Sequence, residues 1–283
     1  MSEHGGIRRM LNRAGRIKQA LRARDEVKVE AYPHVECYSW RPRSGKLNFG
    51  DHLAEVIVDG VLARRGLMRE EETAVSSRLF SIGSVLHFAQ TGDTVWGSGV
   101  NGKIAEDQHS YASLDVRAVR GPRTAQFLSA RGIAVPDVFG DPALLLPHLL
   151  PGRFTVTGDN GPIFVPNLND LDSFESPIPV ASPLRGWNHV VNQIVRSSLV
   201  LASSLHGLIL AEAFGIPARY VRLSEHESTF KYADYYEGTG REGAEEVTSI
   251  EAGLERGGRD PVVFSAEKLL EAFPYDLWRQ PEA

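Results

Sequence analysis

The chain has 283 residues, of which 42% are hydrophobic and 24% charged, and its formal net charge at pH 7 is −5. This length and composition are typical of a globular protein with room for two α/β domains, and the acidic balance excludes a global basic field for nucleic acid. The single cysteine, Cys37, excludes an intramolecular disulfide and a multi-cysteine zinc site within one chain. Because neither a long apolar run nor the apolar core of a signal peptide is visible, we expect a cytoplasmic protein.

The first patterned stretch is 7–24, which we predict to be a basic amphipathic helix within an N-terminal segment, 1–30. Apolar side chains recur along it at helical spacing, and it carries seven Lys and Arg residues with no acid between them. Such a helix can lie on an anionic membrane surface, which would place the protein at the inner face of the cell membrane. It can equally pack on the body or on a partner chain with its arginines in water.

Residues 31–150 are expected to form a first Rossmann-like domain, because strand-like runs, small-residue turns and helical stretches alternate along them. The expected strands are 36–40, 78–83, 94–100, 114–120 and a short one at 138–143, and the expected helices are 52–64 and 123–131. Asp51 could cap the first of these helices, and Pro122 suits the first turn of the second.

Prolines and glycines between 147 and 161 predict a linker, so that 151–283 would form a second Rossmann-like domain. Its expected strands are 162–166, 199–202 and one from 218, and its expected helices are 187–196, 205–214 and 265–273. The polar stretch 223–247 predicts loop and short helix at the edge of a cleft. Residues 274–278 are expected to pack back across the domain interface.

The stretch 198–222 predicts a buried strand, a polar turn, a helix and a second strand. Ser203, Ser204 and His206 would then lie at the carboxyl end of a parallel strand, where ligands gather in open α/β sheets. The N–H groups of the helix start favour an anion, and a histidine can titrate near neutral pH. The residues alone therefore predict an anion site with an acid or base, or else a histidine that only packs.

Short motifs occur along the chain in a fixed order. They are Asn48-Phe-Gly-Asp51, Ser81-Ile-Gly-Ser84, Trp96-Gly-Ser-Gly99, Val119-Arg-Gly-Pro122, Gly140-Asp-Pro142 and Ser203-Ser-Leu-His-Gly207 with Gly215-Ile-Pro217. The ordered set, covering roughly residues 45–222, resembles the polysaccharide pyruvyl transferase family, with the ketal pyruvyltransferases of the xanthan and succinoglycan type the nearest in pattern. The resemblance implies an α/β fold of two Rossmann-like domains, similar to GT-B glycosyltransferases, with an interdomain cleft.

The resemblance also implies a reaction and a set of roles. Such enzymes transfer a carboxyethylidene group from phosphoenolpyruvate to two hydroxyls of a sugar, forming a cyclic ketal and releasing phosphate. His206 matches the family's histidine and would be the general acid or base, and Arg120 would bind the donor's carboxylate or phosphate. The substrate-binding residues implied are Asn48, Asp51, Ser98, Gly99, Arg117, Asp141, Ser203, Ser204 and Gly207.

Alternatives stay open at several of these positions. Asp51 and Asp141 could serve only as caps, and Arg117 could be solvated. Many family members have arginine where this chain has Ser204, so another cation would have to bind the donor. The candidates are Arg219, Arg222 and Lys231.

The implied partners are phosphoenolpyruvate and a polysaccharide or lipid-linked oligosaccharide acceptor, with no cofactor, metal or nucleic acid. The loops 40–47, 100–112 and 223–242 offer aromatic side chains for stacking on sugar faces: Trp40, Tyr111, Tyr235 and Tyr236. Two other functions remain: a GT-B glycosyltransferase that uses a nucleotide sugar, and a non-catalytic glycan-binding relative.

Overall fold

The computed structural model describes residues 32–42, 45, 47–171, 174–225, 227–259, 262 and 264–281. The predicted basic helix at 7–24, with the rest of the segment 1–30, lies outside these residues. Pro33–Ala283 form one compact unit. Within the described ranges, none of the helices combines the length and the hydrophobicity needed to cross a membrane.

Four parallel strands form the first sheet, in the order β1-β2-β3-β4. They are β1 (Val35–Cys37), β2 (Ser77–Phe80), β3 (Thr94–Trp96) and β4 (Asp115–Ala118). The helices of this half are α2 (Phe49–Ala63), η1 (Leu86–Phe88), η2 (Glu106–Gln108), α3 (Pro122–Ser129), η3 (Pro142–Leu145) and α4 (Leu146–Leu149). The strand predicted at 138–143 is wrong, because only a bridge between Val119 and Phe139 forms before the chain turns into η3.

Three parallel strands form the second sheet, in the order β5-β6-β7. They are β5 (Ile163–Val165), β6 (Val200–Ala202) and β7 (Ala218–Tyr220). The helices of this half are η4 (Leu168–Asp170), α5 (Trp187–Arg196), α6 (Leu205–Ala213), α7 (Phe230–Gly238), α8 (Ile250–Arg256), α9 (Ala266–Glu271) and η5 (Tyr275–Trp278). The strand-turn-helix-strand unit predicted for 198–222 is confirmed as β6, α6 and β7.

The prediction of an α/β protein with parallel sheets is confirmed. In both sheets the strands follow one another in chain order, without the reversal of order that creates a topological switch point. The strands are also shorter than predicted, because the residues after each one leave the ladder as loops. Those loops at the carboxyl ends are what the site is built from.

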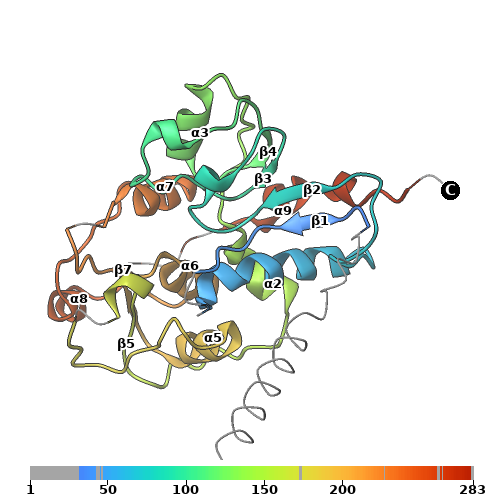
Figure 1. Ribbon diagram of the computed structural model, residues 1–283. Coiled ribbons are helices and arrows are strands. Elements are labelled where there is room, and N and C mark those ends of the chain that lie inside the picture. Colours follow the sequence, from blue (N-terminus) through green and yellow to red (C-terminus); the bar gives the residue numbers. More distant parts are fainter. Residues whose placement is uncertain are drawn as a thin grey trace, which may run out of the picture. The chain divides into compact units, whose positions relative to one another are not determined.

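A continuous hydrophobic core joins the two sheets. Side chains of α2, α5 and α6 share one buried cluster with Leu79 of β2 and Val165 of β5. Figure 1 shows α2 and α6 in the region between the first sheet and the strands of the second. The alternate strand residues Phe80 and Phe164 point to the opposite faces, where separate clusters cover them. Each sheet is therefore covered on both faces, as parallel sheets require.

The C-terminal segment returns to the first half of the chain, as expected for residues 274–278. Trp96 Nε1 donates a hydrogen bond to the carbonyl oxygen of Leu269 (2.8 Å), and Phe273 packs edge-on against the Trp96 ring. Tyr275 donates to the Val61 carbonyl (3.2 Å).

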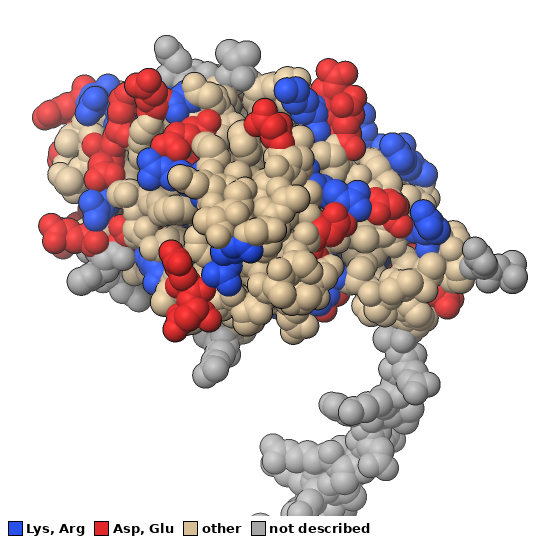
Figure 2. Space-filling model, turned by 90° about the horizontal axis from the view of Figure 1, so that it is seen from above, with Lys and Arg blue, Asp and Glu red and all other residues tan. Residues whose placement is uncertain are grey.

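On the face seen in Figure 2, basic and acidic side chains are interspersed.

Candidate functional site

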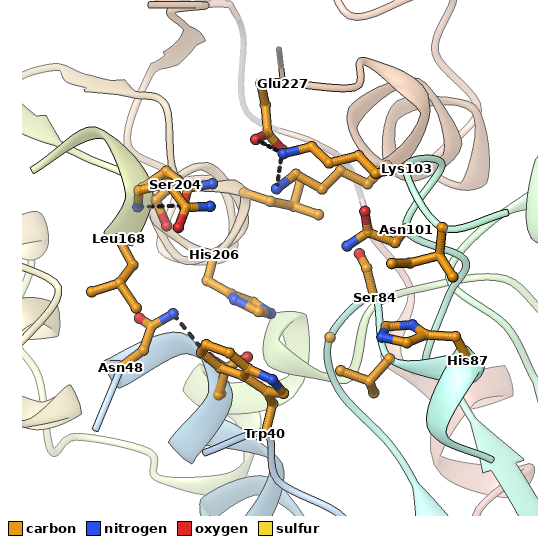
Figure 3. A pocket seen from close by; sticks show the side chains of 18 of the residues that line it. Trp40, Asn48, Ser84, His87, Asn101, Lys103, Leu168, Ser204, His206 and Glu227 are labelled. Carbon is orange, nitrogen blue, oxygen red and sulfur yellow. Dashed lines mark hydrogen bonds and ion pairs between the residues drawn. The ribbon is translucent and has the colours of Figure 1, made fainter. Parts of the chain in front are cut away.

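A pocket with a cavity volume of about 320 Å³ lies where the carboxyl ends of strands from both sheets meet. Parallel strands present their carboxyl ends at one edge, so the loops that follow them converge. The polar lining residues are Asn48, Asp51, Ser84, His87, Asn101, Lys103, Asn167, Asn169, Ser204, His206, Glu227 and Lys231. Trp40, Val85, Phe88, Ile104, Leu168 and Leu205 add apolar surface. Figure 3 shows these side chains surrounding the cavity.

His206 lies in the first turn of α6 and points into the pocket (Figure 3). Ser204 caps this helix, because its Oγ accepts a hydrogen bond from the Gly207 N–H (3.3 Å). His206 is 9% exposed, and its Nε2 has no hydrogen-bond partner within the described part of the chain. Burial, with the charges of Lys231 and Arg120, lowers the pKa of His206 to about 3. The imidazole is therefore neutral at physiological pH and has a nitrogen free for a ligand.

Gly50 explains why the motif at 48–51 contains a glycine. A Cβ built on Gly50 would lie 2.3 Å from Nδ1 of His206, which is far closer than two such atoms can approach. The start of α2 therefore packs directly on the imidazole ring. Only glycine lets the two come together.

Replacing Gly50 with alanine should displace the His206 ring, because the added methyl group and the imidazole cannot occupy the same space. We expect a lower melting temperature and a loss of ligand-induced stabilisation. The control is Gly161→Ala, an exposed position where an added Cβ meets no atom within 4 Å and where φ is not positive. Thermal unfolding of both variants tests this, and equal behaviour would contradict the packing argument.

Asp51 is not the helix cap that the sequence suggested. Asn48 caps α2: its Oδ1 accepts from the Gly50 N–H (3.3 Å), and its Nδ2 donates to Asp51 Oδ2 (2.9 Å). Asp51 instead lines the pocket. Burial raises its pKa to about 7, against the opposing effects of the Asn48 hydrogen bond and the charge of Lys231. This carboxyl group can therefore hold a proton near neutral pH.

Two lysines bring positive charge to the pocket. Lys231 Nζ lies 2.7 Å from Glu227 Oε1, and Lys103, which comes from the loop after β3, pairs with the other oxygen of the same carboxylate. Burial lowers the pKa of Lys231 while Glu227 opposes the shift. Two cations share one carboxylate here, so this part of the pocket keeps a net positive charge that suits an anion.

Of the three cations considered as substitutes for the arginine absent at Ser204, the structure brings Lys231 into the pocket. Arg219 is 4% exposed and donates to the carbonyl oxygen of Gly257. Arg222 pairs with Glu246 at 3.2 Å. Neither arginine lines the cavity.

Arg120 lies behind the pocket wall and is not among the lining residues. Its side chain is 0% exposed and forms an ion pair with Asp234 of α7, also 0% exposed, at 2.9 Å. It further donates to Ser84 Oγ (2.6 Å) and to the Val100 carbonyl (2.8 Å). Gly99 gives it room, since a Cβ there would lie 2.5 Å from the guanidinium carbon. Arg120 thus ties α7 to the loops after β2 and β3, and its contact with the donor stays a prediction.

Of the five remaining predicted residues, three are buried around the pocket loops, and two, Asp141 and Arg117, form other contacts. Ser98, Ser203 and Gly207 are buried around the pocket loops: Ser98 donates to the Gly83 carbonyl (2.9 Å), Ser203 Oγ accepts from the Asn167 N–H (2.9 Å), and Gly207 packs on Val165. Asp141 caps η3 through the Ala143 N–H (3.0 Å), and burial raises its pKa to about 6. Arg117 of β4 lies outside the pocket and pairs with Asp115 and Asp276.

The structure corrects three of the four expected sugar-stacking residues. Trp40 lines the pocket. Tyr111, Tyr235 and Tyr236 are buried in the hydrophobic core, so they offer no face to a sugar. The polar composition of 223–247 predicts loop and short helix at a cleft edge, whereas the structure buries both tyrosines of α7.

Sequence reasoning missed Ser84, His87, Asn101, Lys103 and Glu227. Ser84 follows β2, and Asn101 and Lys103 follow β3. The rule that placed His206 at the carboxyl end of β6 could have found these as well. Glu227 carried no such signal, because it follows no strand directly.

Two parallel sheets with a shared pocket, a helix N-terminus, a neutral histidine and two lysines define an α/β protein whose site suits an anionic ligand. No group of three or more metal-binding side chains occurs among the residues that the structure describes. A family model described as polysaccharide pyruvyl transferase matches residues 30–225, and the chain belongs to that family.

A similar protein is the succinoglycan biosynthesis protein ExoV of Rhizobium meliloti (strain 1021). The two are 31% identical over 215 residues, a stretch that covers 70% of this chain and 63% of ExoV. The chain therefore spans somewhat less than two thirds of this relative's length.

Proposed function

We propose that this protein transfers a carboxyethylidene group from phosphoenolpyruvate to two hydroxyls of a sugar, forming a cyclic ketal and releasing phosphate. The sugar would belong to an exopolysaccharide or to its lipid-linked oligosaccharide precursor, and the reaction would occur in a cleft between two Rossmann-like halves, as in GT-B enzymes. The observation that carries the proposal is the neutral imidazole of His206 at a helix N-terminus, in one pocket with Lys231, because its Nε2 has no hydrogen-bond partner among the residues that the structure describes. Membership of the pyruvyl transferase family supports it.

The donor requires a site with several positive or N–H groups, because phosphoenolpyruvate carries both a carboxylate and a phosphate. Lys231 and Lys103 supply cations, and the first turn of α6 supplies N–H groups whose partial positive charge favours an anion. Positive charge at the departing phosphate stabilises the negative charge that develops there. In this proposal Lys231 binds the anionic donor in place of the arginine that many family members carry at the position of Ser204.

The acceptor would enter beside Trp40 and Phe88, whose rings can stack on the apolar face of a sugar. A lipid-linked acceptor lies at a membrane, and the seven Lys and Arg residues of 7–24 would favour an anionic surface. Unchanged binding to anionic liposomes after deletion of residues 1–24 would remove this last part of the proposal.

The experiment that tests the function is thermal unfolding of the protein with phosphoenolpyruvate, UDP-sugars and GDP-sugars. A ligand at 100 times its Kd raises the free energy of unfolding by about 2.7 kcal/mol, which gives an easily measured shift in melting temperature. We expect stabilisation by phosphoenolpyruvate, and phosphate release once an acceptor sugar is added. Stabilisation by a nucleotide sugar alone would indicate glycosyl transfer, and no stabilisation by any of them would indicate a glycan-binding protein.

Lys231→Met should weaken phosphoenolpyruvate binding at least about 10-fold, because one unit charge beside an anion at a half-buried site is worth more than ~1.4 kcal/mol. The matched control is Lys268→Met on α9, an exposed lysine that does not line the pocket. The same thermal assay compares their Kd values. Equal affinity in the two variants would exclude Lys231 as a donor ligand.

A further inference from the structure

Ketal formation from phosphoenolpyruvate requires two proton transfers that a single residue does not easily perform together. The methylene carbon of the donor must gain a proton while a sugar hydroxyl loses one. The proposed function assigns one acid or base, His206, to this chemistry. The carboxyl group of Asp51 also lines the pocket and can act as an acid or base, but the proposed function gives it no chemical role.

The geometry makes Asp51 and His206 neighbours that face one cavity. Both line the pocket, and Gly50, the residue before Asp51, packs on the His206 ring. Asn48 donates a hydrogen bond to Oδ2 of Asp51. Oδ1 receives no hydrogen bond from any residue that the structure describes. It lies 3.8 Å from the position that a Cβ would take on Gly83, another lining residue. A proton on this carboxyl group therefore belongs on Oδ1, beside a residue that lines the cavity.

We propose that Asp51 is the acid that protonates the methylene carbon of phosphoenolpyruvate and that His206 is the base that takes the proton from the attacking sugar hydroxyl. This assignment rests on the proposed function and divides its two proton transfers between two residues. Asn48 is then a positioning residue, because its amide occupies Oδ2 and leaves Oδ1 to carry the proton.

The charges around the two groups favour this division. The groups that act on the Asp51 carboxyl are the amide of Asn48, the ammonium of Lys231 on α7 and the phenol of Tyr38, while Gly50, the residue before Asp51, packs on the His206 ring. Burial outweighs the opposing effects there, so the carboxyl group keeps its proton near neutral pH. Burial, together with the charges of Lys231 and Arg120, keeps a proton off the His206 imidazole. Neighbouring groups whose environments push their pKa values apart are the usual arrangement of an acid and a base.

The protons and electrons balance over the whole reaction. In the first step the sugar oxygen bonds to C2 of the donor, its proton passes to His206 Nε2, and the C2–C3 double bond takes the proton of Asp51 to form a methyl group. In the second step the bond from C2 to the phosphate oxygen breaks, and phosphate leaves with the electron pair and the proton held by His206. The second hydroxyl then bonds to C2 and returns its proton to Asp51. Both residues end as they began.

The test that needs no acceptor is proton uptake on phosphoenolpyruvate binding, measured by calorimetry at pH 8 in buffers of different ionisation enthalpy. At this pH the free carboxyl group of Asp51 is mostly ionised, and a bound polyanion should force it to take up close to one proton. We expect this uptake in the unaltered protein and in His206→Gln, and its loss in Asp51→Asn. Absence of uptake in the unaltered protein, or its loss in His206→Gln instead, would overturn the assignment.

Turnover gives the second readout, with phosphate release from phosphoenolpyruvate measured in the presence of methyl glucosides and methyl galactosides. Asp51→Asn should lower kcat about 10²–10⁴-fold with little change in phosphoenolpyruvate Kd, and Asp51→Glu should restore part of it. The log of kcat/KM should fall as pH rises through about 7 in the unaltered protein, because the acid form is lost there, and this limb should vanish in Asp51→Asn. A kcat within about three-fold of the unaltered value in Asp51→Asn would contradict the assignment while leaving the proposed function intact. Failure of the unaltered protein to bind phosphoenolpyruvate would overturn both.

Discussion

His206→Gln is expected to lower kcat for phosphate release about 10²–10⁴-fold, which is the usual contribution of a general acid or base. Glutamine keeps a polar side chain of similar reach but cannot take a proton. Because the imidazole is neutral in the pocket, its removal changes no charge at the donor site, and the Kd for phosphoenolpyruvate should change only a few-fold. Steady-state phosphate release and calorimetric binding on the same preparation separate the two quantities.

The control for this variant is His189→Gln, an exposed histidine on α5 that does not line the pocket. It should keep full activity. The pH dependence adds a further check: with a pKa of about 3, His206 stays in its basic form down to pH 5, so kcat/KM should not fall on the acid side because of this residue. A kcat for His206→Gln equal to that of the control would show that the histidine only packs.

Arg120→Met is expected to destabilise the protein by about 3–5 kcal/mol, the usual cost of removing one partner of a buried ion pair. The change leaves the Asp234 carboxylate buried without its ion-pair partner, although the N–H and hydroxyl of Thr124 still bond to it. A loss of 1 kcal/mol lowers the melting temperature of a chain of this size by about 2–4 °C. Denaturant unfolding and thermal unfolding measure both quantities.

Two further variants decide what Arg120 does. Arg120→Met with Asp234→Leu should cost less than the sum of the single changes, because the unpaired charge is gone. Arg117→Met, which breaks partly exposed ion pairs on β4, should cost no more than about 1 kcal/mol. If Arg120→Met kept full stability and lost phosphoenolpyruvate binding, Arg120 would be a donor ligand, as its place in the motif at 119–122 predicts.

The amino-acid sequence by itself determined most of the strands and the longer helices, and with them the part of the pocket that follows β6. Hydrophobic runs bounded by small residues are local signals, so the unit formed by β6, α6 and β7 could be predicted, and with it the place of His206 at a helix N-terminus. The ordered motifs identified the family. Asn48, Asp51 and Ser204, predicted from those motifs, also line the pocket.

Tertiary structure alone decided which charged side chains reach the cavity. Arg120 forms its ion pair outside the cavity with Asp234, a residue 114 positions further along the chain. Lys103 and Lys231, which are also distant in sequence, both pair with Glu227. Tyr235 and Tyr236 point into the core because α7 packs against α3 and against buried neighbours, which its polar sequence context does not reveal. Local patterning fixes which residues form a helix or strand, whereas the partner of a buried charge depends on contacts between segments that are distant in sequence.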